Sequence, residues 1–385
     1  MTFSHLTSHF SRLSSHDSRL TAHDSRLTIH DSRLTIHDSP YLRTMIIRSK
    51  SPLRIGFAGG GTDVSPYSDL YGGAILNATI SLYSYATIEP TTDNKIVLHA
   101  IDRKERLEFD SIMELPIDGN LDLLKGIYNR VAKDYAKKPL SFHLSTYVDA
   151  PAGSGLGTSS SLVVAILNAF AEWLNIPLGE YELAHLAYEI ERKDLGQAGG
   201  KQDQYAAAFG GFNFMEFYAD DKVIVNPLRI KENYLNEMQY CILLYYTGTS
   251  RLSSKIVEMQ AKNVHEKKEK SIEAMHKLKE QAVMMKEAIL KGNLNEIGAI
   301  LNYGWHSKKE TAEGISNPII DEIYETALKT GALGGKISGA GGGGFMFFYC
   351  PSFSRYEVID RLHQFGGEFR RFQFTKQGAT AWLAK

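Results

Sequence analysis

Hydrophobic and polar positions follow two different periods along the chain, and these periods predict a mixture of strands and helices. Apolar and polar residues alternate in segments such as Leu53–Phe57 and Leu140–Val148, which is typical of half-buried strands. We predict strands over 46–58, 73–89, 95–100, 106–110, 140–148, 240–246, 345–349 and 369–374. Apolar residues three or four positions apart predict helices after Leu121, over 162–170 and 181–193, within 253–291 and over 354–365. The predicted fold class is therefore α+β.

Two of these helices carry apolar stripes that predict their buried faces. The first helix is expected to bury Leu124, Ile127, Val131 and Tyr135 on one side. The second stripe lies in the long charged segment Ser253–Lys291. It consists of Ile272, Met275, Leu278, Ala282, Met285 and Ile289. A stripe at helical spacing is typical of a face that packs into a core, so we interpret both stripes as core rather than as ligand contacts.

Residues 1–44 differ from the rest of the chain because they repeat a seven-residue unit. The unit spans 11–17 and recurs in 18–24, 25–31 and 32–38. Leu is its main apolar residue, and Ile occupies a second apolar position in only two units, which is too weak a seam for a coiled coil. We therefore expect disorder or a marginal helix, and we interpret Met45, where the strand pattern begins, as the true start.

The overall composition excludes several classes of protein. A net charge of −1 over 385 residues creates no field that would attract nucleic acid or an anionic membrane. No apolar run approaches the length of a membrane span, and the N-terminus lacks the apolar core of a signal peptide. The two cysteines, Cys241 and Cys350, lie in apolar segments, which indicates buried thiols. We expect a cytoplasmic protein without nucleic-acid or membrane partners.

The segment 151–161 reads Pro-Ala-Gly-Ser-Gly-Leu-Gly-Thr-Ser-Ser-Ser, and this pattern is typical of a phosphate site. Its alternating glycines leave backbone N–H groups free to turn toward an anion, and the helix predicted after it presents further unpaired N–H groups. Its hydroxyl groups add hydrogen-bond donors or an oxygen ligand for Mg²⁺. A Walker loop is excluded because no Lys follows the last glycine. Taken alone, the segment could still be a helix cap with a flexible lead-in.

Two more glycine-rich turns adjoin predicted strands. In 51–63, an alternating strand runs into Gly59-Gly60-Gly61-Thr62-Asp63. In 335–344, the run Gly-Lys-Ile-Ser-Gly-Ala-Gly-Gly-Gly-Gly opens into an apolar strand, which is unusual for a flexible linker.

Acidic residues that could carry chemistry lie between these glycine-rich segments. Glu189 and Glu191 fall near the end of the helix predicted over 181–193. Asp203 follows Gly199-Gly200, and by itself it reads as an ordinary acid at the start of a helix.

Together these segments resemble the motifs of the GHMP kinases, a superfamily that includes galactokinase, homoserine kinase and mevalonate kinase. The resemblance extends from about Met45 to the C-terminus, and within the superfamily it is strongest to the heptose 7-phosphate kinases. It implies a ribosomal-S5-like N-terminal domain over 45–237 and a ferredoxin-like C-terminal domain over 238–385, with the active site between them.

The resemblance also implies an activity. ATP would phosphorylate the anomeric hydroxyl of D-glycero-α-D-manno-heptose 7-phosphate, giving the 1,7-bisphosphate that leads toward nucleotide-activated heptose. Asp203 would be the catalytic carboxylate with Arg54 beside it, and Ser159 and Glu191 would hold Mg²⁺, with Glu189 the less favoured ligand. The implied sugar contacts are Gly60, Gly61, Thr62 and Asp63. The implied ATP contacts are Pro151, Gly153, Ser154, Gly155, Leu156, Gly157, Thr158, Ser159, Ser160, Gly339, Gly341 and Gly342.

A substrate that already carries a phosphate needs a second cationic site. The candidates for this site are Arg192, Lys193, Lys201, Lys308 and Lys309. Another sugar 1-kinase, such as an L-fucokinase, is the alternative activity, and a noncatalytic sugar sensor is an alternative of another class. The expected partners are ATP and a sugar phosphate, and a homodimer is left open.

Removal of residues 1–44 should change neither stability nor turnover. The repeats bury too little apolar surface to offset an ordering entropy of about 1–2 kcal/mol per residue. We expect a chain that starts at Met45 to melt within about one or two degrees of the full chain, with the same kcat/KM. A large fall in either quantity, measured by calorimetry and by kinase assay, would contradict this interpretation.

Overall fold

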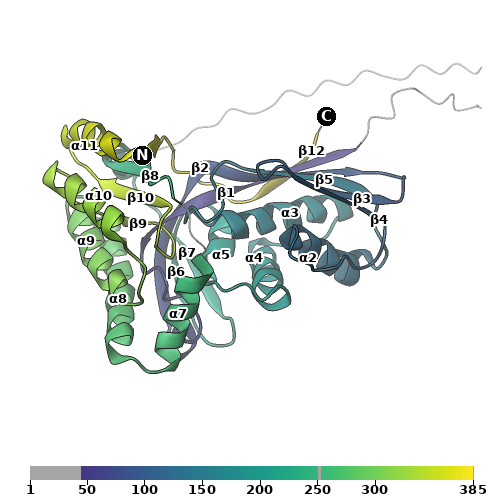
Figure 1. Ribbon diagram of the computed structural model, residues 1–385, viewed down its shortest axis with the longest axis horizontal. Helices are drawn as coiled ribbons and strands as arrows, with labels where there is room; N and C mark the ends of the chain where they lie inside the picture. Colours follow the sequence, from purple (N-terminus) through teal and green to yellow (C-terminus); the bar gives the residue numbers. More distant parts are fainter. Residues whose placement is uncertain (1–44, 250–252, 385) are drawn as a thin grey trace, which may run out of the picture. The chain divides into compact units, whose positions relative to one another are not determined.

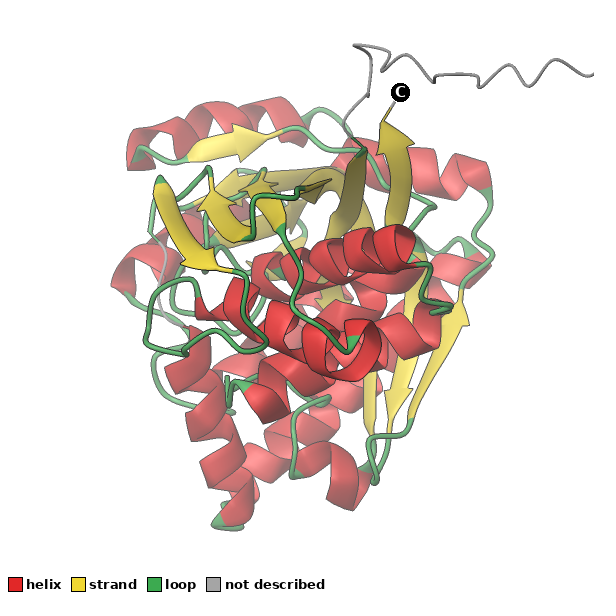
Figure 2. Cartoon of the chain, turned by 90° about the vertical axis from the view of Figure 1, so that its right-hand side faces the viewer, coloured by secondary structure: helices red, strands yellow, loops and turns green. Residues whose placement is uncertain are grey.

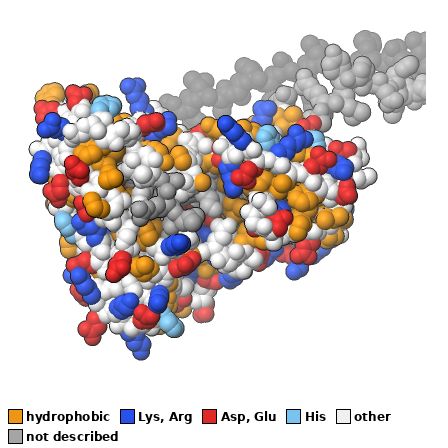
Figure 3. Space-filling model, in the orientation of Figure 1, with side chains coloured by type: hydrophobic (Ala, Val, Ile, Leu, Met, Phe, Trp, Pro, Cys, Tyr) orange, Lys and Arg blue, Asp and Glu red, His pale blue; other side chains and the backbone are white. Residues whose placement is uncertain are grey.

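The computed structural model describes residues 45–249 and 253–384 (Figure 1). The prediction for residues 1–44 lies outside the described residues. Within the described part, no helix is both long enough and apolar enough to cross a bilayer. Figure 3 shows Lys, Arg, Asp and Glu side chains scattered over the visible face rather than gathered by sign, as a net charge of −1 would suggest.

The larger sheet has eight strands and is almost entirely antiparallel. Its main order is β12-β1-β2-β5-β3-β4, and β6 and β7 extend from β2. The strands are β1 (Ile46–Ala58), β2 (Gly73–Pro90), β3 (Lys95–Ala100), β4 (Glu105–Asp110), β5 (Phe142–Val148), β6 (Phe212–Phe217), β7 (Val223–Pro227) and β12 (Thr380–Ala384). Only the pair β3–β5 is parallel. Because side chains alternate along a strand, β5 buries Phe142 and Leu144 on the face that helices cover.

The helices of this half lie on one face of the larger sheet (Figure 1). They are α2 (Asp122–Val131), α3 (Thr158–Leu174), α4 (Glu180–Tyr188) and α5 (Gln202–Phe209), and a short α1 (Tyr67–Tyr71) follows β1. Helix α3 is apolar on most of its surface because it lies between the sheet and its neighbouring helices. Phe142 of β5 and Phe170 of α3 meet edge to face at 5.3 Å between ring centroids.

The second sheet has four antiparallel strands in the order β11-β8-β10-β9. These strands are β8 (Ile242–Tyr246), β9 (Gly334–Ile337), β10 (Phe345–Tyr349) and β11 (Glu368–Arg370). The helices of this half are α6 (Glu232–Cys241), α7 (Ser253–His265), α8 (Glu269–Lys291), α9 (Glu296–Lys309), α10 (Pro318–Lys329) and α11 (Ser354–Leu362). Figure 2 shows helices crossing in front of the strands in the view turned by 90°.

One hydrophobic cluster joins the two sheets and fixes the orientation of β1. Leu53, Ile55 and Phe57 of β1 pack with Met285 of α8 and Phe347 of β10. Because side chains alternate along a strand, the residues between them point away from this cluster. The middle of β1 therefore carries a core on one face and leaves the other face for chemistry.

The predicted α+β class and most predicted elements are confirmed. The stripe of the second helix is buried in α8, apart from a partly buried Ile272. Cys241 and Cys350 are free and fully buried, and burial raises the pKa of each thiol to about 12.

Three local predictions were wrong. Tyr135 is 36% exposed because the chain widens into a π-helical turn at Ala132–Ala136, which rotates it off the apolar face. Tyr240 and Cys241 end α6 instead of opening a strand. Strand β11 stops at Arg370, because the chain then turns to the other sheet, where Phe374 forms a bridge with Ile80. The division into domains at 237/238 stays a prediction.

Candidate active site

Three glycine-rich segments, far apart in the sequence, meet through backbone hydrogen bonds. The Arg54 N–H in β1 donates to the Leu156 carbonyl at 3.0 Å. The Phe345 N–H at the start of β10 donates to the Ser154 carbonyl at 2.8 Å, and the Ser338 hydroxyl donates to the Gly155 carbonyl at 2.8 Å. The loop before α3 is therefore held from both sides, by the first strand and by the C-terminal glycine segment.

The two loops approach so closely that only glycine fits at the contact. Gly155 has φ +83°, and a Cβ there would lie 2.3 Å from the Ser338 carbonyl oxygen. Gly339 has φ +74°, and its Cβ would lie 2.7 Å from the Gly155 Cα. Both positions combine a left-handed backbone with a lack of space, which explains the glycines there.

Arg54 and Asp203 form a bidentate ion pair on the open face of β1. Arg54 Nε and Nη2 donate to the two carboxylate oxygens of Asp203 at 2.7 and 2.8 Å. Arg54 Nη1 donates to the Gly155 carbonyl at 2.5 Å, so one guanidinium joins the loop and the carboxylate. Asp203 lies in the first turn of α5, and its side chain is still 19% exposed. A parallel two-bond contact of this kind holds the carboxylate in one orientation.

Glu191 is a buried carboxylate that accepts hydrogen bonds from hydroxyl groups in the first turn of α3. Its Oε1 accepts from Ser159 Oγ and its Oε2 from Ser160 Oγ, both at 2.6 Å. Gln204 Nε2 donates to Oε2 at 2.7 Å. Glu191 lies in a π-helical segment, Glu189–Asp194, that follows α4. The wider turn places Glu191 inward, whereas Glu189 pairs with Arg130 on the outside at 2.6 Å.

Asp63 is the second buried carboxylate, and it lies in the turn after β1. Its Oδ2 accepts from the Gln202 N–H at 3.0 Å, and its Oδ1 has no hydrogen-bond partner among the described residues. Burial raises the pKa of the Asp63 carboxyl, the negative charge of Asp203 raises it further, and the bond from Gln202 opposes both effects. A buried oxygen without a partner, close to a cavity, is suited to accept a hydroxyl group.

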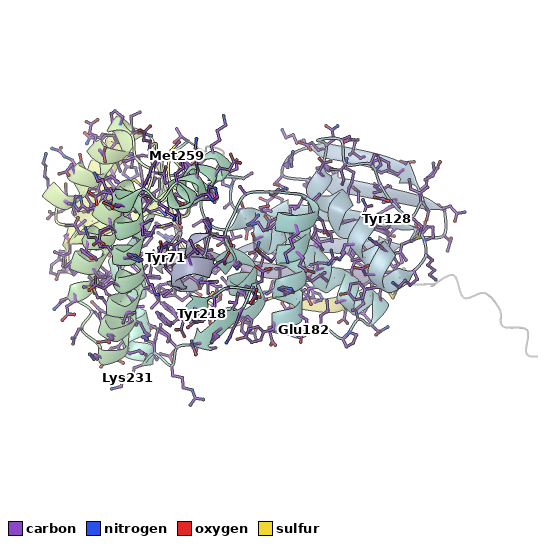
Figure 4. All side chains as sticks on the ribbon, turned by 90° about the horizontal axis from the view of Figure 1, so that it is seen from below. Tyr71, Tyr128, Glu182, Tyr218, Lys231 and Met259 are labelled. Atoms are coloured by element: carbon purple, nitrogen blue, oxygen red, sulfur yellow. The ribbon has the colours of Figure 1, made fainter. Side chains whose placement is uncertain are left out.

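These groups line one cavity of about 730 Å³. The predicted site residues that line it are Arg54, Gly61, Asp63, Gly153, Gly155, Gly157, Thr158, Ser159, Ser160, Glu191, Asp203 and Gly339. Helix α7 forms part of the wall through Ser254, Val257, Glu258 and Gln260. In Figure 4 the label Met259 marks this helix, and the label Tyr128 marks α2 in the other half of the molecule.

The remaining predicted site residues do not line the cavity. They are Gly60, Thr62, Pro151, Ser154, Leu156, Gly341 and Gly342. Leu156 belongs to the core between the sheets, and the Thr62 hydroxyl donates to the carbonyls of Gly59 and Ala74.

Sequence reasoning assigned no role to Ser338, Gln202 or Gln204. Ser338 and Gln204 lie inside motifs that carried the resemblance, and this was the one available signal for them.

Comparison with known proteins identifies the family. Residues 122–211 match the model of the GHMP kinases N-terminal domain, and 285–368 match that of the GHMP kinases C-terminal domain. A D-glycero-alpha-D-manno-heptose 7-phosphate kinase from Campylobacter jejuni is 51% identical over 336 residues, which are 87% of this chain and 98% of that protein. The chain belongs to the GHMP kinases. The predicted family and fold are thereby confirmed, and the family implies ATP as the phosphoryl donor.

Two further relatives place this GHMP kinase among sugar kinases. A crystal structure of a D-glycero-D-manno-heptose 1-phosphate kinase from Bacteroides thetaiotaomicron has 48% identity and a TM-score of 0.75, covering 87% of this chain and 98% of that one. An L-fucokinase/L-fucose-1-P guanylyltransferase from Bacteroides fragilis is 27% identical over 326 residues, which are 78% of this chain but 34% of that protein.

The contact between the glycine loops predicts a specific loss of stability in Gly155→Ala. The variant has to tolerate a left-handed alanine, which costs about 1–2 kcal/mol, and a backbone clash that costs a further ~1–3 kcal/mol. Gly314→Ala is the matched control, because Gly314 has φ +77° with no atom within 4 Å of its Cβ position. Urea unfolding of both variants measures the difference, and equal losses would show that the loops can separate at no cost.

Proposed function

We propose that this GHMP kinase transfers the γ-phosphoryl group of ATP to the anomeric hydroxyl of D-glycero-α-D-manno-heptose 7-phosphate, giving the 1,7-bisphosphate and ADP. The observation that carries the proposal is the Arg54–Asp203 pair in the cavity, in a chain that is 51% identical to a kinase named for this substrate. The names of two relatives differ on which carbon carries the phosphate, position 7 in one name and position 1 in the other. We take position 7, because a phosphate at position 1 would occupy the anomeric oxygen that accepts the phosphoryl group in this proposal.

The proposed acceptor site lies between Asp203 and Asp63. Arg54 occupies one lone pair on each oxygen of Asp203, and a remaining lone pair accepts the proton of the attacking hydroxyl. As the oxygen–phosphorus bond forms and the bond to ADP breaks, that proton passes to Asp203. Asp63, with its unpartnered Oδ1, holds another sugar hydroxyl. Orientation of the acceptor contributes more than proton removal, because the transition state for phosphoryl transfer is loose.

The proposed nucleotide site is the loop over 153–160 with the start of α3. Gly153, Gly155 and Gly157 all have positive φ, which turns successive N–H groups toward one side. The positive end of the α3 dipole adds to the attraction for phosphate. Gly339 closes the other side of the loop. These groups stabilise the negative charge on the transferring phosphoryl group without having to reorganise.

Ser159 and Glu191 fit a Mg²⁺ site of the kind that kinases use. Their oxygens already lie 2.6 Å apart at the cavity wall, and both are the hard ligands that Mg²⁺ prefers. Among the described residues, no group of three or more His, Cys, Asp or Glu is placed to hold a metal ion, so phosphates and water would complete the coordination around Ser159 and Glu191. When bound, Mg²⁺ would neutralise charge on the phosphates.

A kinase assay on a panel of sugars tests the proposal. The panel contains D-glycero-D-manno-heptose 7-phosphate, the corresponding 1-phosphate, neutral heptose and L-fucose, each with ATP. We expect turnover of the 7-phosphate with the highest kcat/KM. Preference for L-fucose would establish the alternative kinase activity, and ATP-dependent sugar binding without turnover would establish a sensor.

Asp203→Asn should abolish most of the turnover while the protein keeps its fold and its affinity for ATP. Asn retains the shape of the side chain but accepts no proton, so kcat should fall on the order of 10²–10⁴-fold. Steady-state kinetics, together with a melting curve and an ATP-binding titration, measure the three properties. An unchanged kcat in a folded variant would refute this role for Asp203.

Ser159→Ala should raise the Mg²⁺ concentration needed for half-maximal activity and leave the KM of the sugar unchanged. The variant loses one oxygen ligand, and Mg²⁺ tolerates an incomplete octahedron poorly. Ser160→Ala is the comparison variant, because Ser160 bonds the other oxygen of Glu191. If the Mg²⁺ requirement stays constant and the sugar KM rises, Ser159 is misassigned, and the same titration on Thr158→Ala and Ser160→Ala tests those two hydroxyls as the ligand.

A further inference from the structure

Three cationic side chains line the described part of the cavity, and two of them already have a carboxylate partner. Arg54 pairs with Asp203 at 2.7 Å, and Arg192 Nη1 lies 3.1 Å from Glu191 Oε1. Lys308 is the third, and no carboxylate among the described residues lies within 4.0 Å of its Nζ. Its positive charge therefore has no anion in contact.

The other basic candidates for a substrate phosphate are neutralised elsewhere. Lys193 and Lys201 both pair with Asp221, at 2.9 and 3.0 Å. Lys309 pairs with Asp321 at 3.4 Å, and none of the three lines the cavity. Of the five basic residues that the sequence suggested, Lys308 alone combines contact with the cavity and an unmatched charge.

Lys308 is held firmly in place beside the proposed sugar site. It lies in the last turn of α9, its side chain is 1% exposed, and its Nζ donates to the Gly60 carbonyl at 3.2 Å. Its own carbonyl accepts from the Thr311 hydroxyl at 2.8 Å, and Gln260 Nε2 of α7 donates to that hydroxyl at 2.8 Å. The ammonium group therefore lies beside the turn that carries Asp63, and no carboxylate among the described residues is in contact with it.

A buried cation without a counterion is costly, which is the physical reason to expect an anionic ligand there. Burial lowers the pKa of Lys308 to about 8, Asp63 opposes this shift and Arg54 adds to it. The neighbouring Lys336 on β9 is also buried and its pKa is lowered, partly because of Lys308. Among the described residues, the acids on the cavity wall are Asp63, Glu191, Asp203 and the exposed Glu258 of α7. Two of them, Asp203 and Glu191, already pair with Arg54 and Arg192.

We propose that Lys308 binds the phosphate that the sugar substrate already carries, and that this contact makes the enzyme prefer a sugar phosphate to the neutral sugar. The inference rests on the proposed function and extends it by naming the residue that sets the substrate class. The N–H group of Gly61, which lines the cavity and donates to no described residue, is a further donor for this phosphate in the same turn.

Lys308→Met tests the inference, because Met keeps the length of the side chain and removes the charge. The KM for the heptose 7-phosphate should rise about ten- to a hundredfold, which is the usual effect of losing one hydrogen bond to a charged group. The KM for neutral heptose and the KM for ATP should not change. Lys309→Met is the matched control, since that residue pairs with Asp321 outside the cavity, and its kinetics should equal those of the unaltered enzyme.

The pH profile provides a readout that a merely structural lysine would not move. For the sugar phosphate, kcat/KM should fall as the pH rises through about 8, because the free enzyme loses the ammonium charge there. Lys308→Arg keeps its charge to far higher pH, so this fall should disappear in that variant while the affinity for the sugar phosphate is largely kept. The profile for the neutral sugar should show no such change between the two proteins.

Several outcomes would overturn the inference. Equal losses of Lys308→Met on phosphorylated and neutral sugars would mean that Lys308 holds a hydroxyl or only the fold, and a higher KM for ATP would mean that it contacts the nucleotide. If Lys308→Met leaves the KM for the heptose 7-phosphate unaltered, Lys308 does not bind this substrate. If the unaltered enzyme rejects the heptose 7-phosphate but accepts another sugar phosphate, the proposed substrate fails, and the same comparison on that sugar phosphate still decides the role of Lys308. If the unaltered enzyme accepts only neutral sugars, both proposals fail.

Discussion

The contact between backbones at Gly155 and Gly339 is the constraint on which the rest of the site depends. Neither residue can carry a side chain, so the loop before α3 and the loop after β9 approach within van der Waals distance. The carbonyls of Ser154, Gly155 and Leu156 then all accept hydrogen bonds, from β1 on one side and from the segment over 338–345 on the other. The glycine-rich loop before α3 is therefore held as part of the fold, and Arg54 reaches Asp203 from a strand whose neighbouring residues pack in the core.

Much of this arrangement follows from the sequence because local patterns and global packing agree. The alternation in β1 places Leu53 and Ile55 in the core and therefore Arg54 on the opposite face, where the ion pair forms. The apolar stripe of α8 and the apolar strand β10 were equally visible. The glycine segments could be located from the sequence. The roles of Asp203 and Glu191 were predicted from the resemblance.

Other features could not be read from local patterns, because they depend on contacts between distant parts of the chain. The choice between Glu189 and Glu191 depends on a π-helical turn that rotates one inward and leaves the other on Arg130. The lack of a carboxylate partner for Lys308 can be recognised only from the positions of the surrounding acids in the folded chain. Strand β12 pairs with β1, and no turn pattern in the sequence connects these two distant segments. Tyr135 points away from the apolar face because the π-helical turn over Ala132–Ala136 is wider than an α-helical turn.

The pairing of β12 with β1 has a consequence for the order in which the chain folds. Ile46 lies opposite Ala384, so the first described strand gains its outer neighbour only from the last one. During synthesis, β1 has an unpaired edge until β12 has been made, and such an edge can pair with other chains. The glycine-rich loop before α3 shares this delay, because the segment over 338–345 that bonds to it is also made late. Nascent chains of this kinase should therefore need protection from association until β12 has been made.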